Sequence, residues 1–259
     1  MKEPLMVVSR YLKGTTVGMQ CRRARELGFD GIEWFQDDGA LFSPEEGKER
    51  ADTAAAYGLC AGYHAPFLGS WNLGVLSGSC LVGVLESFIG TAATLAADHI
   101  SIHMGSFGEH AVRSKALARI ADALMIAAPS AEKKGVSLCL ENTTVCFSKR
   151  EIGAAMEDFT FVYRRVSSSA LRMTLDTGHG NITGTLIELV RRFGARIANI
   201  HVSDNDGVKD LHLPPFQGTS PLNALVKILD KEGYRGPFTF EFPADDKTYQ
   251  ELIGRFRSF

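Results

Sequence analysis

The sequence predicts a single-domain (β/α)₈ barrel, the α/β fold also called a TIM barrel, over residues 1–259. The chain has 259 residues, a length that one such barrel commonly fills. Short runs of β-branched and apolar residues alternate with longer amphipathic segments, a pattern typical of parallel strands joined by helices. The alternation occurs eight times without an internal repeat or a flexible linker, so we expect one barrel with one core.

The eight expected strands are short and apolar. They cover residues 5–10, 31–35, 59–64, 99–103, 136–141, 171–176, 197–202 and 237–242. The helices between them have recognisable ends, because a glycine after an amphipathic run commonly ends a helix in the left-handed conformation. This role is expected for Gly28, Gly58, Gly135, Gly194 and Gly233.

Two helix starts are marked by a serine followed by a proline. The segment 43–46 (SPEE) predicts an N-cap serine, a proline in the first turn and a glutamate that completes a capping box. The Ser-Pro step at 220–221 predicts a second cap followed by a proline. Gly178 and Gly180 instead follow a strand end, where we expect them to permit a tight turn.

The composition is that of an ordinary globular protein, with 45% hydrophobic and 22% charged residues. The formal net charge is −2 and the basic residues are spread over several expected helices, which argues against a nucleic-acid surface. No segment approaches the roughly 18 apolar residues of a membrane span, and the apolar run near residue 5 is too short for a signal peptide. We therefore expect a cytoplasmic protein without membrane contact. The five cysteines form no C-x-x-C pair and are expected to be reduced thiols.

Side chains that can bind a metal lie at the ends of six expected strands. They are His64, His103, Glu141, Asp176, His201 and Glu241. Active sites of α/β barrels are built at this end of the strands, so these side chains should meet at one mouth. Two further histidines, His179 and His212, also lie just beyond strand ends, whereas His99 lies at the start of its strand and is expected to be structural.

Four of these residues, Glu141, Asp176, His201 and Glu241, come from the last four strands and are expected to surround one point. Carboxylates that converge in this way repel one another unless a cation lies between them. Three carboxylates and one imidazole suit Mn²⁺ or Mg²⁺ best, with Zn²⁺ and Co²⁺ as alternatives. The sequence therefore predicts a divalent metal centre.

Seven short motifs occur in order along the chain. They are HAPF at 64–67, SIHMG at 101–105, LEN at 140–142, DTGH at 176–179, HVSDNDG at 201–207, DLHLPP at 210–215 and FEF at 240–242. With these motifs the chain resembles the xylose isomerase-like barrel superfamily of sugar isomerases and epimerases. The resemblance covers nearly the whole chain.

The resemblance implies that Glu141, Asp176, His201 and Glu241 bind one metal and that Glu141 and Glu241 also act as catalytic acid and base. The implied reaction is isomerisation or epimerisation of a small sugar, keto-polyol or sugar phosphate, by proton transfer through a metal-bound enediolate. His179 is expected to hydrogen-bond a substrate oxygen. The ketose epimerases carry an arginine soon after the strand-seven histidine, whereas this chain has Gly207 there.

An alternative from another class is a zinc phosphodiesterase acting on DNA, because the endonuclease IV family shares the barrel and binds three zinc ions. The residues that match its ligands are His64, His103, Glu141, Asp176, His179, His201, Asp210, His212 and Glu241. Against it, the loops at 36–39 (QDDG) and 204–210 (DNDGVKD) are acidic, and DNA binding depends on neutralising phosphates. We therefore expect a sugar or polyol substrate and no nucleic-acid partner. The sequence is compatible with a homo-oligomer and does not determine the oligomeric state.

The five residues His64, His103, His179, Asp210 and His212 remain as an auxiliary set for substrate oxygens or a further ion. Asp210 and His212 are two residues apart, so an extended loop would turn both side chains to one side. We expect them to face His179 across the mouth.

Overall fold

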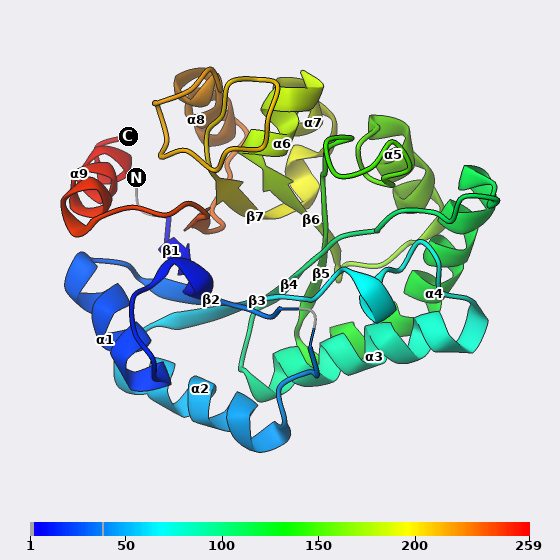
Figure 1. Ribbon diagram of the computed structural model, residues 1–259, viewed down its shortest axis with the longest axis horizontal. Helices are drawn as coiled ribbons and strands as arrows, with labels where there is room; N and C mark the ends of the chain where they lie inside the picture. Colours follow the sequence, from blue (N-terminus) through cyan, green and yellow to red (C-terminus); the bar gives the residue numbers. More distant parts are fainter. Residues whose placement is uncertain (1–2, 38) are drawn as a thin grey trace.

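The computed structural model describes residues 3–37 and 39–259, and it shows a closed barrel of parallel strands with helices around it (Figure 1). Each strand pairs with the next along the chain, and β8 pairs with β1 to close the barrel. This confirms the predicted fold class. The strands are β1 (Leu5–Val8), β2 (Gly31–Phe35), β3 (Cys60–His64), β4 (His99–Ile102), β5 (Ser137–Glu141), β6 (Leu171–Asp176), β7 (Ile197–Val202) and β8 (Phe238–Phe240).

The helices cover the outside of the barrel between successive strands (Figure 1). The α-helices are α1 (Val17–Leu27), α2 (Pro44–Ala56), α3 (Gly78–Thr94), α4 (Arg113–Lys134), α5 (Met156–Arg165), α6 (Thr177–Thr183), α7 (Leu186–Phe193), α8 (Leu222–Lys231) and α9 (Asp246–Arg257). The short 3₁₀ helices of the described residues are η1 (Ser9–Tyr11), η2 (Gly69–Trp71) and η3 (Gly194–Arg196). Within the described ranges, every helix is too short or too polar to traverse a lipid bilayer.

All eight expected strands form, with small differences at their ends. The first is shorter than expected, because the chain turns into η1 directly after Val8. The last ends at Phe240, so Glu241 stands immediately after β8.

Local signals predicted most helix ends correctly. Gly28, Gly58, Gly135 and Gly233 all have positive φ angles. The prediction for Gly194 is wrong: its φ is −49°, because the chain continues there into η3 rather than reversing.

The predicted capping box of α2 is confirmed, with the Ser43 and Glu46 side chains each accepting a hydrogen bond from the other residue's backbone N–H. The cap predicted at Ser220 is wrong by one residue, since Pro221 is the N-cap of α8. The backbone N–H of Ser220 instead donates to Asp204 Oδ1 at 3.0 Å, which ties this loop to the segment after β7.

The tight turn expected at Gly178 and Gly180 is also wrong, because α6 begins immediately after Asp176. Glycine serves close packing here instead. A Cβ atom at Gly178 would lie 2.6 Å from Ser203 Oγ, and one at Gly180 would lie 3.0 Å from the Leu186 side chain.

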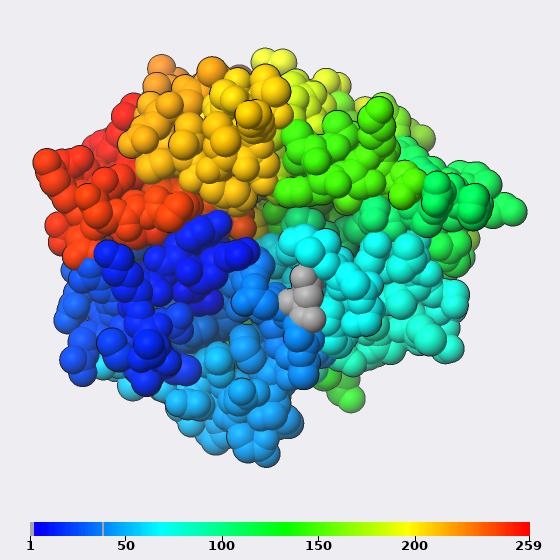
Figure 2. All heavy atoms as spheres, viewed as in Figure 1, coloured from blue at the N-terminus to red at the C-terminus, as the bar shows by residue number. Residues whose placement is uncertain are grey.

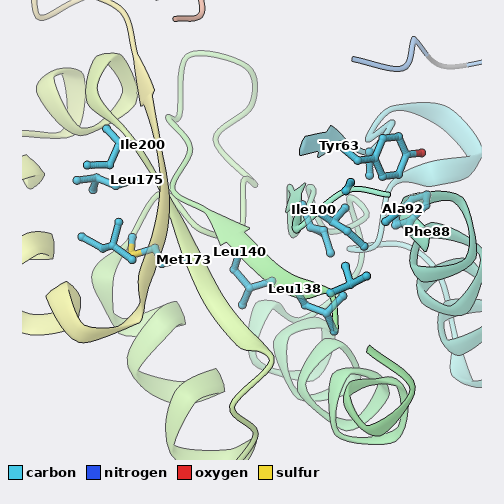
Figure 3. Close-up of a cluster of buried hydrophobic side chains, with 14 of the residues drawn as sticks. Tyr63, Phe88, Ala92, Ile100, Leu138, Leu140, Met173, Leu175 and Ile200 are labelled. Atoms are coloured by element: carbon cyan, nitrogen blue, oxygen red, sulfur yellow. The ribbon is translucent and has the colours of Figure 1, made fainter. Parts of the chain in front are cut away.

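Alternate residues of each strand point to opposite faces, and the two faces differ in chemistry. Outward residues form an apolar layer against the helices; Figure 3 shows Tyr63 and Ile100 lying close to Phe88 and Ala92 of α3. Inward residues include polar side chains that meet across the barrel: Ser101 Oγ lies 2.9 Å from Thr174 Oγ1, and Thr239 Oγ1 donates to Asn199 Oδ1 at 2.7 Å. The barrel interior is therefore partly a polar network rather than a purely apolar core.

Candidate functional site

The site lies where strands β5 to β8 end, and it contains the four residues expected to form a metal centre: Glu141, Asp176, His201 and Glu241. We call these the four core residues. One potential ligand atom from each lies within 4.8 Å of the others, and all four side chains are buried. His201 Nδ1 is 3.3 Å from Glu141 Oε1 and 3.1 Å from Glu241 Oε2. The structure thus brings the four core residues together.

Each of the three carboxylates has a buried oxygen without a hydrogen bond from any residue that the structure describes. These atoms are Glu141 Oε2, Asp176 Oδ2 and Glu241 Oε2. Buried carboxylate oxygens normally have partners, because leaving them unpaired is costly. A divalent cation among the three oxygens and His201 Nδ1 would satisfy all of them, and this donor set suits a hard or borderline ion. The residues therefore fit a metal ion.

Asn142 holds the ends of β5 and β6 together. Its Oδ1 accepts from the Asp176 backbone N–H at 2.8 Å, and its Nδ2 donates to the Asp176 backbone oxygen at 2.9 Å. Asp176 Oδ1 in turn accepts from the His179 backbone N–H at 2.6 Å and so caps α6. These contacts leave Asp176 Oδ2 free to face the other core residues. The sequence analysis included Asn142 in a motif but assigned it no role.

The auxiliary residues surround the four core residues in two groups. In the first, the Nε2 atoms of His64 and His103 lie 3.5 and 3.4 Å from Glu141 Oε2. In the second, Asp210 Oδ2 lies 3.6 Å from His179 Nε2 and 3.2 Å from His212 Nε2. All nine residues named from the sequence are therefore at one mouth.

The second group is held by backbone contacts. His179 Nδ1 donates to the Asn142 backbone oxygen at 2.9 Å, and His212 Nδ1 donates to the Glu241 backbone oxygen at 2.6 Å. His212 adopts a positive φ of 45°, uncommon for a residue other than glycine. This conformation lets the loop after β7 bring His212 back toward β8.

Segments that are distant in sequence lie side by side around this mouth, as the blue, cyan, green and gold surfaces in Figure 2 show. Phe67, from the segment after β3, stacks on His103 with ring centroids 4.2 Å apart. Phe147, from the segment after β5, packs edge-on against His179 at 5.6 Å. The ring centroids of Phe35 and His64 lie 4.7 Å apart. These rings cover the auxiliary histidines and limit the access of water.

The electrostatics of the four core residues are dominated by burial and mutual charge. Burial lowers the pKa of His201, but the carboxylates of Glu33, Glu141 and Glu241 outweigh it and raise that pKa well above its usual value. Burial raises the pKa of Asp176 to about 7, and the charges of Glu241 and Glu141 act in the same direction. Without a metal, the positive charge on His201 therefore offsets part of the carboxylate repulsion.

In the second auxiliary group, burial and neighbouring carboxylates also have opposite effects on the pKa values of the histidines. Burial lowers the pKa of His179, yet Asp176 and Asp210 outweigh it and raise that pKa to about 10. Asp210 and Glu241 raise the pKa of His212 to about 10 against the effect of burial. These two histidines therefore offer proton donors, rather than acceptors, to an oxygen-rich ligand.

Sequence analysis missed Glu33, a fully buried residue in the middle of β2. Its Oε1 lies 2.8 Å from His201 Nε2, and its Oε2 lies 3.0 Å from His99 Nε2. The available signal was an acidic residue inside an otherwise apolar strand. His99 is not among the residues at the mouth, and its contact with Glu33 agrees with the structural role expected for it.

The barrel and the cluster at its carboxyl end define the protein as a TIM barrel with a group of potential metal ligands at the strand ends. The chain belongs to the xylose isomerase-like TIM barrel family, whose sequence model matches residues 21–259.

Among curated proteins, fructoselysine 3-epimerase from Shigella flexneri is 24% identical over 255 residues, which cover 92% of this chain and 91% of that enzyme. Uncharacterized protein y4fM from Sinorhizobium fredii is 31% identical over 112 residues, which span 41% of this chain and only 36% of that protein.

Two solved structures share the fold. A D-tagatose 3-epimerase-like protein superposes with a TM-score of 0.84 at 22% identity, covering 98% of this chain and 97% of its own. The 3-keto-D-glucoside 4-epimerase YcjR from E. coli superposes with a TM-score of 0.81 at 16% identity, covering all of both chains.

Proposed function

We propose that the protein is a divalent-metal-dependent epimerase of a small keto-sugar, with Glu141 and Glu241 as the acid and base. The observation that carries this proposal is the placement of both glutamates within 3.3 Å of His201 Nδ1, each with a buried oxygen free of hydrogen bonds. The names of the fructoselysine and D-tagatose 3-epimerase relatives favour epimerisation over isomerisation. The substrate class extends to keto-polyols and sugar phosphates.

The four core residues would hold the ion, with Mn²⁺ or Mg²⁺ favoured and Zn²⁺ or Co²⁺ as alternatives. A bound divalent cation polarises a substrate carbonyl and its neighbouring hydroxyl oxygen and so acidifies the C–H bond between them. Glu141 ends β5 and Glu241 directly follows β8, so the two side chains enter the site from different strands. Each can therefore reach a different face of the same carbon atom.

One glutamate, ionised, takes the proton from the acidic carbon, and the electron pair of the broken C–H bond forms an enediolate. The other glutamate, protonated, returns a proton to the opposite face and inverts the configuration. Proton exchange with water resets the pair before the next turnover. His64, His103, His179 and His212 would donate hydrogen bonds to the remaining substrate oxygens.

The proposal is tested by incubating metal-reconstituted protein in D₂O with D-tagatose, D-psicose, fructoselysine and a 3-keto-D-glucoside. We expect deuterium to enter one carbon next to the carbonyl of at least one sugar, together with a new epimer visible by NMR. Protein that binds one equivalent of metal, yet incorporates no deuterium into any of the four, would contradict the proposal.

A second candidate is the zinc phosphodiesterase, which is favoured by one observation: His64 and His103 both approach Glu141 Oε2, and His179 and His212 both approach Asp210. The charge at the mouth argues against it. Asp37 and Asp206 are exposed there; Asp38 lies outside the described residues. Asp204, in contrast, is buried and accepts backbone hydrogen bonds, so it does not add to the surface charge.

We expect zinc-loaded protein not to cleave a DNA duplex that contains an abasic site. The exposed carboxylates of Asp37 and Asp206 repel phosphates, whose neutralisation dominates DNA affinity. The measurement is strand incision on a denaturing gel at physiological salt. Efficient incision that disappears in Glu141→Gln would establish the phosphodiesterase instead.

A further inference from the structure

Glu33 lies inside the barrel beneath the four core residues, and its contact with His201 bears on which ring nitrogen of His201 carries a proton. Both of its oxygens accept hydrogen bonds. Oε1 lies 2.8 Å from His201 Nε2, while Oε2 accepts from Asn199 Nδ2 at 2.9 Å and lies 3.0 Å from His99 Nε2. The hydroxyl of Ser101 adds a longer contact to Oε2, at 3.3 Å.

An ionised carboxylate only accepts hydrogen bonds, so the proton in the short contact belongs to His201 Nε2. Once that proton is on Nε2, the other ring nitrogen of a neutral imidazole carries a lone pair. That nitrogen is Nδ1, which faces Glu141 and Glu241. The contact with Glu33 therefore selects the one neutral form of His201 that can bind a cation at the mouth.

The surroundings keep Glu33 in place. Asn199 can only donate to it, because the Oδ1 atom of Asn199 is occupied by the hydroxyl of Thr239 at 2.7 Å. Gly62, the partner of Glu33 in the β2–β3 register, provides the space for His99. A Cβ atom at Gly62 would lie 2.6 Å from the His99 ring and 3.3 Å from Glu33 Cγ.

We propose that Glu33 is a positioning residue for His201, which it holds in the Nε2-protonated form and in the orientation that directs Nδ1 at the metal. This inference rests on the proposed metal centre. Hydrogen bonds to the distal nitrogen of a metal-binding histidine fix its orientation and raise its basicity, and their loss commonly weakens metal binding about 10- to 100-fold. Glu33 acts through His201 and does not itself reach the mouth.

The first test compares Co²⁺ binding by the wild type, Glu33→Gln and Tyr163→Phe. The side-chain amide of glutamine has one acceptor and one donor. Its NH₂ group must therefore face an N–H group of either His201 or Asn199. We expect Glu33→Gln to bind Co²⁺ about 10- to 100-fold more weakly and with an altered visible absorption spectrum. Tyr163→Phe is the matched control, because it removes the hydroxyl of a buried tyrosine that donates to the Arg172 backbone oxygen rather than to a group around Glu33. Its Co²⁺ affinity should stay close to that of the wild type.

The second test needs no substitution and holds even if Glu33→Gln fails to fold. Long-range ¹H–¹⁵N NMR of the wild-type protein loaded with Zn²⁺ reports which nitrogen of His201 carries the proton. We expect a proton on Nε2 and none on Nδ1. A proton on Nδ1, or an unchanged Co²⁺ affinity and spectrum in a folded Glu33→Gln protein, would overturn the role of Glu33.

These readouts separate the two proposals, because neither depends on a sugar substrate. Wild-type protein that binds neither Co²⁺ nor Zn²⁺ would refute the metal centre itself. Wild-type protein that binds metal but epimerises no sugar would refute the proposed reaction and leave the role of Glu33 intact.

Discussion

Replacing either Glu141 or Glu241 with glutamine is expected to lower epimerase kcat/KM by about 10²- to 10⁴-fold, the usual contribution of a positioned acid or base. Glutamine keeps the shape of the side chain but can neither take nor supply the proton. Because both residues are also candidate ligands, metal content must be measured in each variant by elemental analysis. Kinetics are then compared at equal metal occupancy.

Separate roles for the two glutamates predict a further difference. In D₂O, the variant that retains the base should still exchange the acidic substrate proton with solvent, although it forms no epimer. Asp206→Asn is the control, since Asp206 is exposed and its contacts are to the backbone N–H groups of Val208 and Lys209. Full turnover in Glu141→Gln or Glu241→Gln would remove the two-glutamate mechanism.

Removal of the metal by EDTA is expected to abolish activity and to lower the melting temperature by about 5–10 °C. Three buried carboxylates repel one another when no cation lies between them. An ion present at about 100 times its Kd stabilises the folded chain by about 2.7 kcal/mol, and in a protein of this size each kcal/mol shifts the melting temperature by about 2–4 °C. The measurement is calorimetry with and without EDTA, followed by addition of Mn²⁺.

His201→Ala serves as the control for this experiment, because it lacks one of the four core residues and should show little metal-dependent shift. The same melting temperature before and after chelation, in wild-type protein known to contain metal, would argue against a centre built from the four core residues.

The metal affinity should also depend on pH. Without metal, His201 has a raised pKa and Asp176 has a pKa of about 7, so both bind protons that an entering cation must displace. Raising the pH removes the competing protons and favours the metal. We therefore expect the Kd for Mn²⁺ to fall as the pH rises from 6 to 8, and a constant Kd over this range would contradict this account.

Much of the site was predictable because a parallel barrel places the carboxyl ends of all its strands at one mouth. Strand ends can be read from short apolar runs, so side chains such as Glu141, His201 and Glu241 could be assigned to a common site without knowing any contact. The same reasoning included Asp210 and His212, although they belong to a loop. Their spacing and the length of the loop were enough to predict the approach of Asp210 to His179, while His212 contacts Asp210.

Local features were less predictable where tertiary packing competes with the usual preference of a residue. Gly194 ends α7 in a right-handed conformation and continues into a 3₁₀ helix, and Ser220 donates its backbone N–H to Asp204 instead of capping α8. Position 178 in α6 requires a glycine because Ser203 approaches it too closely for a side chain. For Ser220 and Gly178 the partner is a residue that no local pattern identifies.

The sequence by itself determined the barrel, the order of its strands and the residues that gather at its mouth. These follow from periodicity and from the strand positions, which are properties of short segments. Only the tertiary structure decided that Glu33 faces inward and meets His201, which is 168 residues away in the chain. That contact depends on the register of β2 against β3 and on the space left by Gly62, because a shift of one residue would turn Glu33 to the outer face of the barrel.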